Sequence, residues 1–416
     1  MSTSAGDTAW VTIATALVML MTPALGFFYG GLVRRKNIAY TIAQCFAILA
    51  VVSLVWTFWG YSLAFGPSIG GYIGNLDKVL LNNVGVTTPL PIQPGITELS
   101  YYAFQLMFAA IAPALIVGAF AERIRFRSLL IFIVLWSTFV YSPVAHWVWN
   151  PAGWLGIKQL GAIDFAGGTV VHITAGLSAL AAAIVVGPRK SREKIEGKPS
   201  NVPFVILGAA LLWFGWFGFN AGSALSASPL AVSAFVVTNL SAAAATVSWM
   251  VMDVIIKGKP SATGIAIGAV CGLVAITPAS GFVTPASAII IGLAAGIISN
   301  LVSTWRVRTR LDDTLDVFAC HGVSGIWGSI ATGLFATTAV NSSAGVNGLF
   351  YGNPGQLLIQ IEAVLVVAAF AFVVSFALLK IVNVFSKLRV TPEEEEKGLD
   401  LSQFGEEAYC PSDTPS

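Results

Sequence analysis

The chain has 416 residues, of which 56% are hydrophobic and only 10% are charged, and its formal net charge is +2. Soluble domains usually carry about 25% charged residues, so this composition excludes a soluble protein and indicates one that is embedded in a lipid bilayer. A nucleic-acid role is excluded as well, because the 22 Lys and Arg residues form no basic stripe.

Apolar stretches long enough to cross the ~30 Å hydrocarbon layer as helices occur eleven times along the chain. They are too long and too continuous for barrel strands, so we predict an all-α integral membrane protein with eleven transmembrane helices. The predicted spans are residues 8–30, 38–65, 99–120, 128–148, 167–187, 202–219, 230–256, 261–280, 284–304, 317–337 and 356–385. Residues 1–386 therefore form one transmembrane domain, and residues 387–416 form a cytoplasmic tail.

The distribution of Lys and Arg predicts the orientation of the helices. Every basic residue except Lys78 and Lys158 falls in one alternate set of connections or in the tail. That set should face the cytoplasm, so an odd number of spans leaves the N-terminus outside. The connection at 187–201 is expected to be charged and exposed, and the acidic run from Glu393 to Glu396 is expected to be a solvated face.

The fifth and tenth spans share the pattern D-x7-H-x3-G. The matching positions are Asp164 and Asp313, His172 and His321, and Gly176 and Gly325. Five spans precede the 187–201 connection and five follow it, which predicts an inverted five-plus-five repeat. Its halves lie at about 8–187 and 202–337, and the helix at 356–385 stands outside the repeat.

Two of the three histidines occupy equivalent places in this repeat. A histidine in hydrocarbon is costly unless it faces a cavity or a partner. One interpretation is a pair of core histidines satisfied by backbone carbonyls, but the repeated placement favours a functional pair. Adjacent neutral imidazoles can share a proton and can hydrogen-bond a small amine. The remaining histidine, His146, is interpreted as structural.

Carboxylates precede both histidine spans. Helix N-termini favour negative charge, so Asp164 and Asp313 are expected to cap and brace their helices. For Asp164 we expect electrostatic attraction for an entering cation in addition, in preference to direct ligation. The four cysteines (Cys45, Cys271, Cys320 and Cys410) show no ligand spacing, which predicts free thiols and no metal site.

Three residues that suit a small cation fall at outer helix ends: Phe108, Trp149 and Ser223. A single membrane tryptophan is usually an interface anchor. Together, however, aromatic faces attract a desolvated cation by ~0.5–2 kcal/mol each, and a serine oxygen accepts a hydrogen bond. A bare cation meets a large desolvation barrier beyond that point, so we expect the cation to be split and its neutral base and proton to travel separately.

The chain resembles the ammonium transporter family over nearly its whole length. The resemblance rests on Gly26 to Asn37, Ala145 to Trp149, Asp164 to His172, Trp213 to Ser223, Asp312 to His321, and the tail around Leu388. It implies a homotrimer in the cell membrane with one pore per subunit. It also implies a trimeric signalling protein of the PII type that plugs the pores from the cytoplasm.

The resemblance also implies a role for individual residues. Phe108, Trp149 and Ser223 would recruit ammonium, and Phe108 and Phe219 would form a gate with Trp216 lining the pore. His172 and His321 would be twin pore histidines, and Asp164 the buried acidic residue. The expected function is electrogenic ammonium uptake, without enzymatic activity or a cofactor. The alternative is an ammonium sensor or transceptor that signals through its tail, although a dedicated sensor is expected to carry an appended signalling domain.

Overall fold

The computed structural model describes residues 3–190 and 199–409, and most of these residues are helical. Each of the eleven predicted spans contains helix, which confirms the all-α fold. Within the described residues, nine helical segments are long and apolar enough to cross a membrane. The two remaining predicted spans are formed by the short apolar helix α11 and by α13 with the π-helical turns before it.

The helices of the first half are bent by local π-helical and 3-10 turns. They are α1 (Ala5–Leu32), α2 (Ile38–Val55), α3 (Tyr61–Phe65), α4 (Glu98–Ile116), α5 (Phe126–Trp136), α6 (Ser142–Trp149) and α7 (Thr174–Val186). π-Helical turns at Trp56–Gly60, Ser137–Tyr141 and Gly168–Ile173 join or begin these helices. Short 3-10 turns lie at Arg35–Asn37, Val79–Leu81 and Val117–Phe120.

The second half and the tail also consist of α-helices with short π-helical and 3-10 turns. Their helices are α9 (Val202–Gly222), α10 (Pro229–Lys257), α11 (Ala262–Ile276), α12 (Pro285–Val307), α13 (Ser324–Phe335), α14 (Pro354–Phe385) and α15 (Pro392–Lys397). π-Helical turns lie at Phe318–Val323 and Asp400–Phe404, and a 3-10 turn at Leu349–Tyr351. Ser or Thr side chains cap the first turns of α4, α10, α11 and α12, which satisfies amide groups that a helix start leaves free.

Within the described residues, the short strands all lie in the connection between α3 and α4. β1 (Ser68–Ile69) pairs antiparallel with β2 (Ile73–Gly74), and β3 (Pro89–Leu90) pairs antiparallel with β4 (Gln93–Thr97). This is the region that the sequence predicts to be an outer loop. The described strands therefore belong to a surface connection and add nothing to the bundle core.

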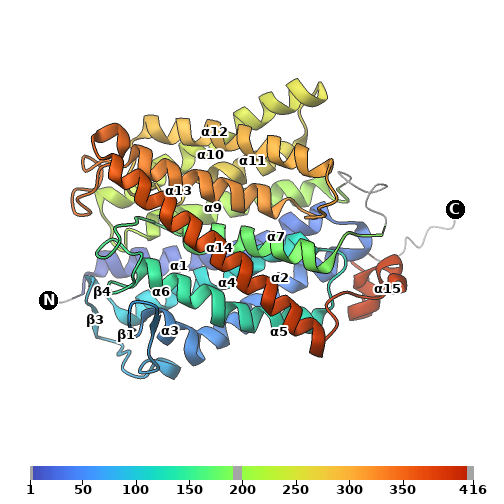
Figure 1. The fold of residues 1–416 in the computed structure, drawn as a ribbon, viewed down its shortest axis with the longest axis horizontal. Coiled ribbons are helices and arrows are strands. Elements are labelled where there is room, and N and C mark those ends of the chain that lie inside the picture. Colours follow the sequence, from blue (N-terminus) through green and yellow to red (C-terminus); the bar gives the residue numbers. More distant parts are fainter. Residues whose placement is uncertain (1–2, 191–198, 410–416) are drawn as a thin grey trace.

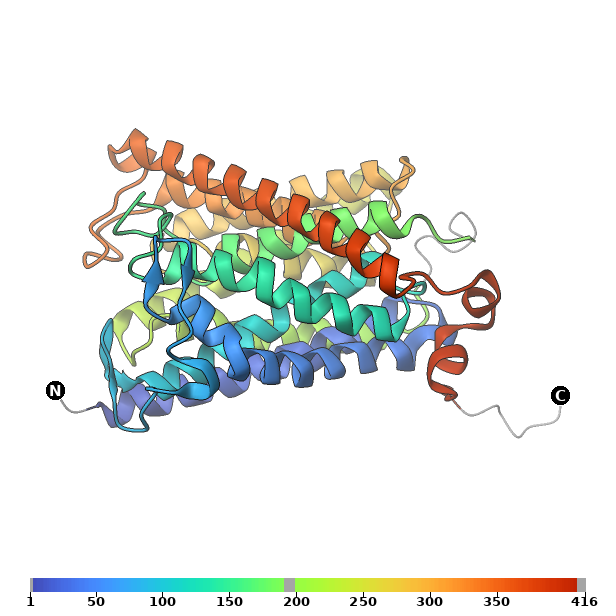
Figure 2. The same ribbon diagram turned by 60° about the horizontal axis from the view of Figure 1, so that its bottom comes forward.

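The described ends of the chain lie at opposite ends of the helix bundle, as an odd number of spans requires (Figure 1). α1 of the first half packs along α9 of the second half, so the two halves meet along this pair of helices. Within the second half, α10 packs against α11 and α12. α14 runs obliquely across the outside and contacts α5, α7 and α13 (Figure 2). The helix outside the repeat is therefore placed to touch both histidine spans.

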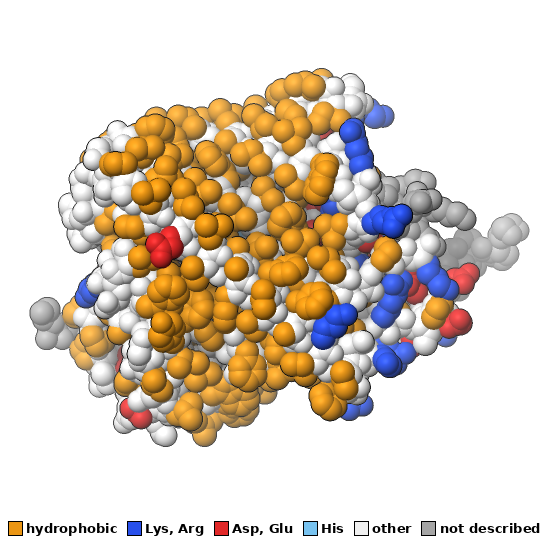
Figure 3. All heavy atoms as spheres, in the orientation of Figure 1, with side chains coloured by type: hydrophobic (Ala, Val, Ile, Leu, Met, Phe, Trp, Pro, Cys, Tyr) orange, Lys and Arg blue, Asp and Glu red, His pale blue; other side chains and the backbone are white. Residues whose placement is uncertain are grey.

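The surface is divided as the positive-inside pattern predicts. Hydrophobic side chains cover the middle of the bundle, and Lys and Arg side chains gather at the end that holds the C-terminal tail (Figure 3). An apolar belt with a basic rim is typical of a protein that sits in a bilayer with that rim in the cytoplasm. We therefore call this the cytoplasmic end and the opposite one the outer end.

Two expectations about charged segments hold only in part: Lys190, Glu393 and Glu396 are exposed as expected, but one charged residue in each segment is buried. Arg189, at the start of the 187–201 connection, is only 8% exposed and forms ion pairs with Asp312 (2.9 Å) and Glu122 (3.2 Å). Residues 191–198 of that connection lie outside the described residues. Glu395, inside the acidic run, is 3% exposed, and it accepts hydrogen bonds from the Lys190 amide (2.9 Å) and the Arg389 guanidinium (2.8 Å).

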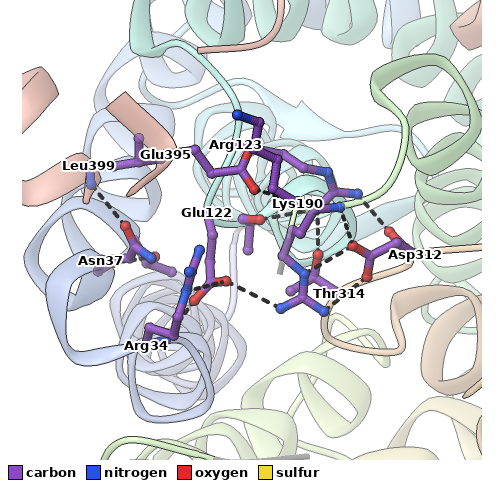
Figure 4. A network of polar contacts seen from close by, with 12 residues as sticks. Arg34, Asn37, Glu122, Arg123, Lys190, Asp312, Thr314, Glu395 and Leu399 are labelled. Carbon is purple, nitrogen blue, oxygen red and sulfur yellow. Dashed lines mark hydrogen bonds and ion pairs between the residues drawn. The ribbon is translucent and has the colours of Figure 1, made fainter. Parts of the chain in front are cut away.

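These groups form one polar cluster at the cytoplasmic end (Figure 4). Arg123 lies at its centre and donates to the Asp312 carbonyl at 2.6 Å and to the Thr314 hydroxyl at 2.5 Å. A buried charge needs a partner to replace water, so Arg189 and Glu395 are paired here, whereas their neighbours Lys190, Glu393 and Glu396 remain exposed. Cys45, Cys271 and Cys320 are buried free thiols, as predicted, and Cys410 lies outside the described residues.

Candidate functional site

A cavity of about 160 Å³ lies at the outer end of the bundle. Its walls include four aromatic rings and two polar side chains: Tyr101, Phe104, Trp149, Phe165, Gln105 and Ser223. The Ser223 hydroxyl donates to the Phe219 carbonyl (2.8 Å), which leaves its oxygen as an acceptor. The Gln105 amide nitrogen donates to the Tyr101 hydroxyl (3.1 Å), and its oxygen has no partner among the described residues. Aromatic faces and free acceptor oxygens together suit a small cation with N–H donors.

A pair of stacked phenyl rings lies next to the Trp149 and Phe104 walls of this cavity. The Phe108 and Phe219 ring centroids lie 4.2 Å apart, with 29° between the ring planes. The Phe108 ring also meets Trp149 edge-on at 5.9 Å. Both phenylalanines are buried. Trp149 and Ser223 therefore line the cavity, whereas Phe108 does not line it and lies behind its Trp149 and Phe104 walls.

The two histidines lie directly below the phenyl stack. The His172 ring centroid lies 5.9 Å from that of Phe219 and 5.4 Å from that of Trp216. The His172 ring plane is nearly parallel to the ring planes of Phe219, Trp216 and His321. The Nδ1 atoms of His172 and His321 are 3.3 Å apart. At this distance one neutral imidazole donates and the other accepts, so the two rings require complementary tautomers.

The remaining nitrogen of His172 is free. Its Nε2 atom is buried and has no hydrogen-bond partner among the described residues. The indole of Trp216 donates instead to the Thr277 hydroxyl (2.8 Å), which fixes the orientation of the ring stacked on His172. The imidazole pair can therefore exchange a proton internally and still offer one nitrogen to a guest molecule.

Asp164 organises the start of the first histidine helix. Its carboxylate accepts the amides of Gly167, Gly168 and Thr169 at 2.8 Å each, and the hydroxyl of Thr169. Gly167 has a φ of 111°, a conformation that favours glycine and turns the chain into the π-helical segment that carries His172. Asp164 therefore has the capping geometry expected from its position, and its carbonyl accepts the Trp149 indole N–H (3.0 Å).

Asp313, the counterpart of Asp164, has a different environment. It is fully buried, and one oxygen accepts the Phe318 amide (2.7 Å) while the other has no partner among the described residues. Burial, reinforced by the nearby charge of Asp316, raises the pKa of Asp313 to about 6. The two carboxylates of the repeat thus occupy equivalent positions but are stabilised to different degrees.

The third member of each motif is a glycine at the crossing of the two histidine helices. A Cβ atom at Gly176 would lie 2.2 Å from the Gly322 Cα atom. A Cβ atom at Gly325 would lie 3.1 Å from the His172 Cβ atom and 3.2 Å from the Gly168 carbonyl oxygen. Because neither glycine has a side chain, each lets the histidine-bearing turn of the other half pack directly against its backbone. Such a reciprocal contact is expected of two halves related by an inverted repeat.

The opposite direction of these helices is visible at both ends. The Arg189 amide, just after α7, donates to the carboxylate of Asp312, just before the second histidine segment (2.8 Å). At the outer end, Gln360 of α14 donates both to the Ile163 carbonyl (2.9 Å) and to the Ser329 carbonyl of α13 (3.2 Å). Where one histidine segment begins, the other therefore ends.

A second cavity, of about 440 Å³, lies at the cytoplasmic end. Its lining mixes apolar residues such as Trp249 and Ile267 with Ser261, Arg306 and Asp316. Arg306 and Asp316 form an ion pair (2.5 Å). This vestibule is larger and more highly charged than the outer cavity, as a mouth that opens to water is expected to be.

Sequence reasoning missed some of the residues that shape the site. Tyr101, Phe165 and Gln105 line the outer cavity, and Thr277 orients Trp216. A signal existed for Gln105 because an amide within an apolar helix needs a partner or a cavity. His146 was interpreted as structural, and both its ring nitrogens have partners, the Ala64 carbonyl (2.8 Å) and the Ser68 hydroxyl (2.7 Å).

Comparison with known proteins gives a consistent answer. The Ammonium Transporter Family profile matches residues 9–409. The chain is 48% identical to the ammonium transporter Amt1 of Archaeoglobus fulgidus over 98% of this chain and 100% of that protein. It is 49% identical to an ammonium transporter of Bacillus subtilis over 97% of this chain and 98% of that protein.

Solved structures show the same similarity. Saccharomyces cerevisiae Mep2 matches with a TM-score of 0.90 and 36% identity, over 99% of this chain and 94% of that one. A structure described as a sensor Amt protein matches with a TM-score of 0.88 and 32% identity, over 96% of this chain and 98% of that one. Similarity of this extent covers the whole bundle and both cavities.

Proposed function

Because the chain belongs to the ammonium transporter family, we propose that this ammonium transporter works by splitting its substrate. Ammonium is captured at the outer cavity and loses its proton near the phenyl stack, and ammonia then passes along the two histidines. The proton travels separately and rejoins ammonia in the cytoplasm. The net event carries one positive charge inward, so uptake is electrogenic.

Recruitment is the role proposed for Phe108, Trp149 and Ser223. The support is the 160 Å³ cavity, where the Trp149 ring and the Ser223 oxygen can both face a small cation. We add Gln105 to this set because its carboxamide oxygen is buried without a partner in the described chain. Phe108 and Phe219 act as the gate, and Trp216 lines the path between the gate and the histidines.

The observation that carries the proposal is the 3.3 Å approach of Nδ1 of His172 to Nδ1 of His321 below a closed aromatic stack. A buried pair of imidazoles can relay a proton, and a water-poor path disfavours passage of hydrated alkali ions. Asp164 braces the outer side of this path and attracts the cation. Asp313 is its support on the cytoplasmic side.

The proposed assembly is a homotrimer in the cell membrane, and each subunit has its own pore. The support for one pore in each subunit is that both cavities, the proposed gate and both histidines come from one chain. A PII-type signalling protein is the proposed cytoplasmic partner. The 440 Å³ vestibule would accept an inserted loop, and its mixed charges at Arg306 and Asp316 offer such a loop polar contacts.

The test is a current measurement on purified protein in vesicles adsorbed to a solid-supported membrane. Addition of ammonium is expected to give a transient inward current, and an equal concentration of potassium is expected to give none. Vesicles without protein are the control. Potassium currents of similar size, or the absence of both current and ammonia flux, would contradict the mechanism.

Sensing through the tail is the second candidate. It is motivated by the similarity to the sensor Amt protein and by the contact of Glu395 with the Lys190 amide, which links the tail to the loop beside Asp312. Hydrogen exchange of residues 392–404, with and without ammonium, would test it. Exchange that does not respond to ammonium would count against a sensing role.

A further inference from the structure

Two glutamines one turn apart project from α14 into the bundle at its outer end. Gln356 and Gln360 are only 3% and 1% exposed. The Gln360 side chain pairs with both backbone groups of one residue: its oxygen accepts the Ile163 amide (2.8 Å) and its nitrogen donates to the Ile163 carbonyl (2.9 Å). The same nitrogen donates to the Ser329 carbonyl (3.2 Å), and Gln356 donates to the Gly161 carbonyl (2.9 Å).

The residue that Gln360 holds is directly next to Asp164. The Asp164 carbonyl accepts the Trp149 indole N–H, and its carboxylate holds the amides that begin the His172 segment. A side chain that pairs with both the amide and the carbonyl of Ile163 fixes the peptide planes on either side of that residue. The position of Asp164, and with it the angle of the Trp149 ring, therefore depends on Gln360.

Gln360 also connects the two halves. Ile163 precedes the first histidine segment, and Ser329 lies in α13, eight residues after His321 in the chain. Gln360 does not line the outer cavity, so its action on a bound cation must pass through the backbone that it holds. α14 stands outside the repeat, and neither half supplies this clamp by itself.

We infer that Gln360 is a positioning residue for ammonium recruitment, through which the helix outside the repeat sets the geometry of the outer cavity. The inference rests on the proposed function. Loss of the clamp loosens the Trp149 and Asp164 pair, so capture weakens while the phenyl stack and histidines below are unchanged. Half-saturation and maximal current should therefore respond differently.

The test compares Gln360→Met with Ser375→Ala, and it measures current against ammonium concentration. Ser375 is also buried on α14, where it bonds Trp136 (3.1 Å) and Ser178 (2.7 Å) far from the outer cavity. Gln360→Met is expected to raise the half-saturating ammonium concentration roughly 5- to 10-fold and to change the maximal current less than about 2-fold, the pattern of lost binding without lost conduction. Ser375→Ala is expected to keep wild-type half-saturation even if its melting temperature falls.

Wild-type half-saturation in a conducting Gln360→Met protein would overturn the inference, as would an equal rise in Ser375→Ala. If Gln360→Met fails to assemble, Gln360→Ala replaces it, because it removes both the acceptor for the Ile163 amide and the donors to the Ile163 and Ser329 carbonyls. Unchanged half-saturation in that variant overturns the inference in the same way. Absence of current in the wild-type protein would instead contradict the proposed function.

Discussion

His172 has one ring nitrogen within 3.3 Å of His321 and another without a partner in the described chain. Replacing it with alanine removes both the relay contact and the free nitrogen. In enzymes, a side chain positioned to transfer a proton raises the reaction rate by about 100-fold or more. His172→Ala should therefore reduce the ammonium-dependent current by about the same factor. Solid-supported membrane recordings on folded, trimeric protein would measure this.

The third histidine provides the control for that prediction. His146 is buried with both ring nitrogens bonded, to the Ala64 carbonyl and the Ser68 hydroxyl. His146→Ala should lower the melting temperature, because it leaves these groups unpaired, but the protein that remains folded should conduct. A wild-type current in His172→Ala, or an equal loss in folded His146→Ala, would refute the relay.

Neighbouring aspartates at the cytoplasmic end predict opposite effects of pH. Burial and the charge of Asp316 raise the pKa of Asp313 to about 6. Burial also opposes ionisation of Asp312, but bonds from Arg189 and the charge of Arg123 outweigh it and lower the pKa of Asp312 to about 2. Between pH 4 and 6 the folded state therefore binds more protons at Asp313 than the unfolded chain does, and stability falls as the pH rises.

Asp313→Asn removes the free-energy cost of ionising this buried carboxyl. The variant is expected to be more stable than the wild type by up to about 3 kcal/mol at pH 8, with a smaller gain at pH 4.5. Asp312→Asn should destabilise at pH 8, because it removes a favourably paired carboxylate. Thermal melting in detergent at both pH values compares the two variants. A gain for Asp313→Asn that is no larger at pH 8 than at pH 4.5 would be inconsistent with a raised pKa.

At the scale of elements, the crossing of the two histidine helices depends on glycine. Gly176→Ala would place a methyl group 2.2 Å from the Gly322 Cα atom, so the backbones must separate. Overpacking of this kind costs about 1–3 kcal/mol. We expect a lower melting temperature and a reduced current, since the same crossing sets the spacing of His172 and His321.

Gly6→Ala is the matched control, because a Cβ atom at Gly6 meets only the Ser4 Oγ atom at 3.8 Å and the Ala227 Cβ atom at 4.0 Å. It should melt and conduct like the wild type. Disulfide or spin-label distances between the helices would report their separation directly. Wild-type melting and current in Gly176→Ala would show that the crossing can relax without cost.

The elements that could be predicted are those whose cause is local in the sequence. Long apolar runs predict helices because hydrocarbon forces backbone bonds to be made within each segment, and every predicted span contains helix. The π-helical turns at Gly168–Ile173 and Phe318–Val323 are not predicted, because an apolar run indicates a helix but does not distinguish a π-helical turn from an α-helical one. The D-x7-H-x3-G pattern identifies the paired segments. It does not predict the close approach of Gly176 to Gly322, because that contact exists only in the folded tertiary structure.

Side chains whose partners lie far along the chain were the hardest to predict. Glu395 reads as a solvated acid in an acidic run, yet it is buried against the Lys190 amide and Arg389. Gln360 lies 197 residues from the peptide that it clamps. Local composition contains no information on such pairs. Phe108, Trp149 and Ser223, by contrast, can be grouped from the sequence, because all three are expected at the outer ends of their helices.

At the scale of the whole molecule, the outer cavity, the phenyl stack, the histidine pair and the cytoplasmic cavity are all formed by one chain. Both halves contribute a histidine, and α14 clamps the halves together at the outer end. In the proposed mechanism, the trimer therefore needs to add no residue to the conducting path. Its subunits are expected to conduct independently, even if a cytoplasmic partner binds all three at once.

Mixed trimers test that independence. Wild-type and His172→Ala chains would be co-expressed at known ratios and purified together through one shared tag, so that the subunits mix at random. If each pore is complete in its own subunit, a population with half of its chains mutated retains about half of the current, whereas a cooperative trimer that needs three intact chains retains about one eighth. Currents at several mixing ratios separate a straight line from a cubic curve. A cubic dependence would mean that the neighbouring subunit contributes to conduction, and that the ring contacts within one chain are insufficient for transport.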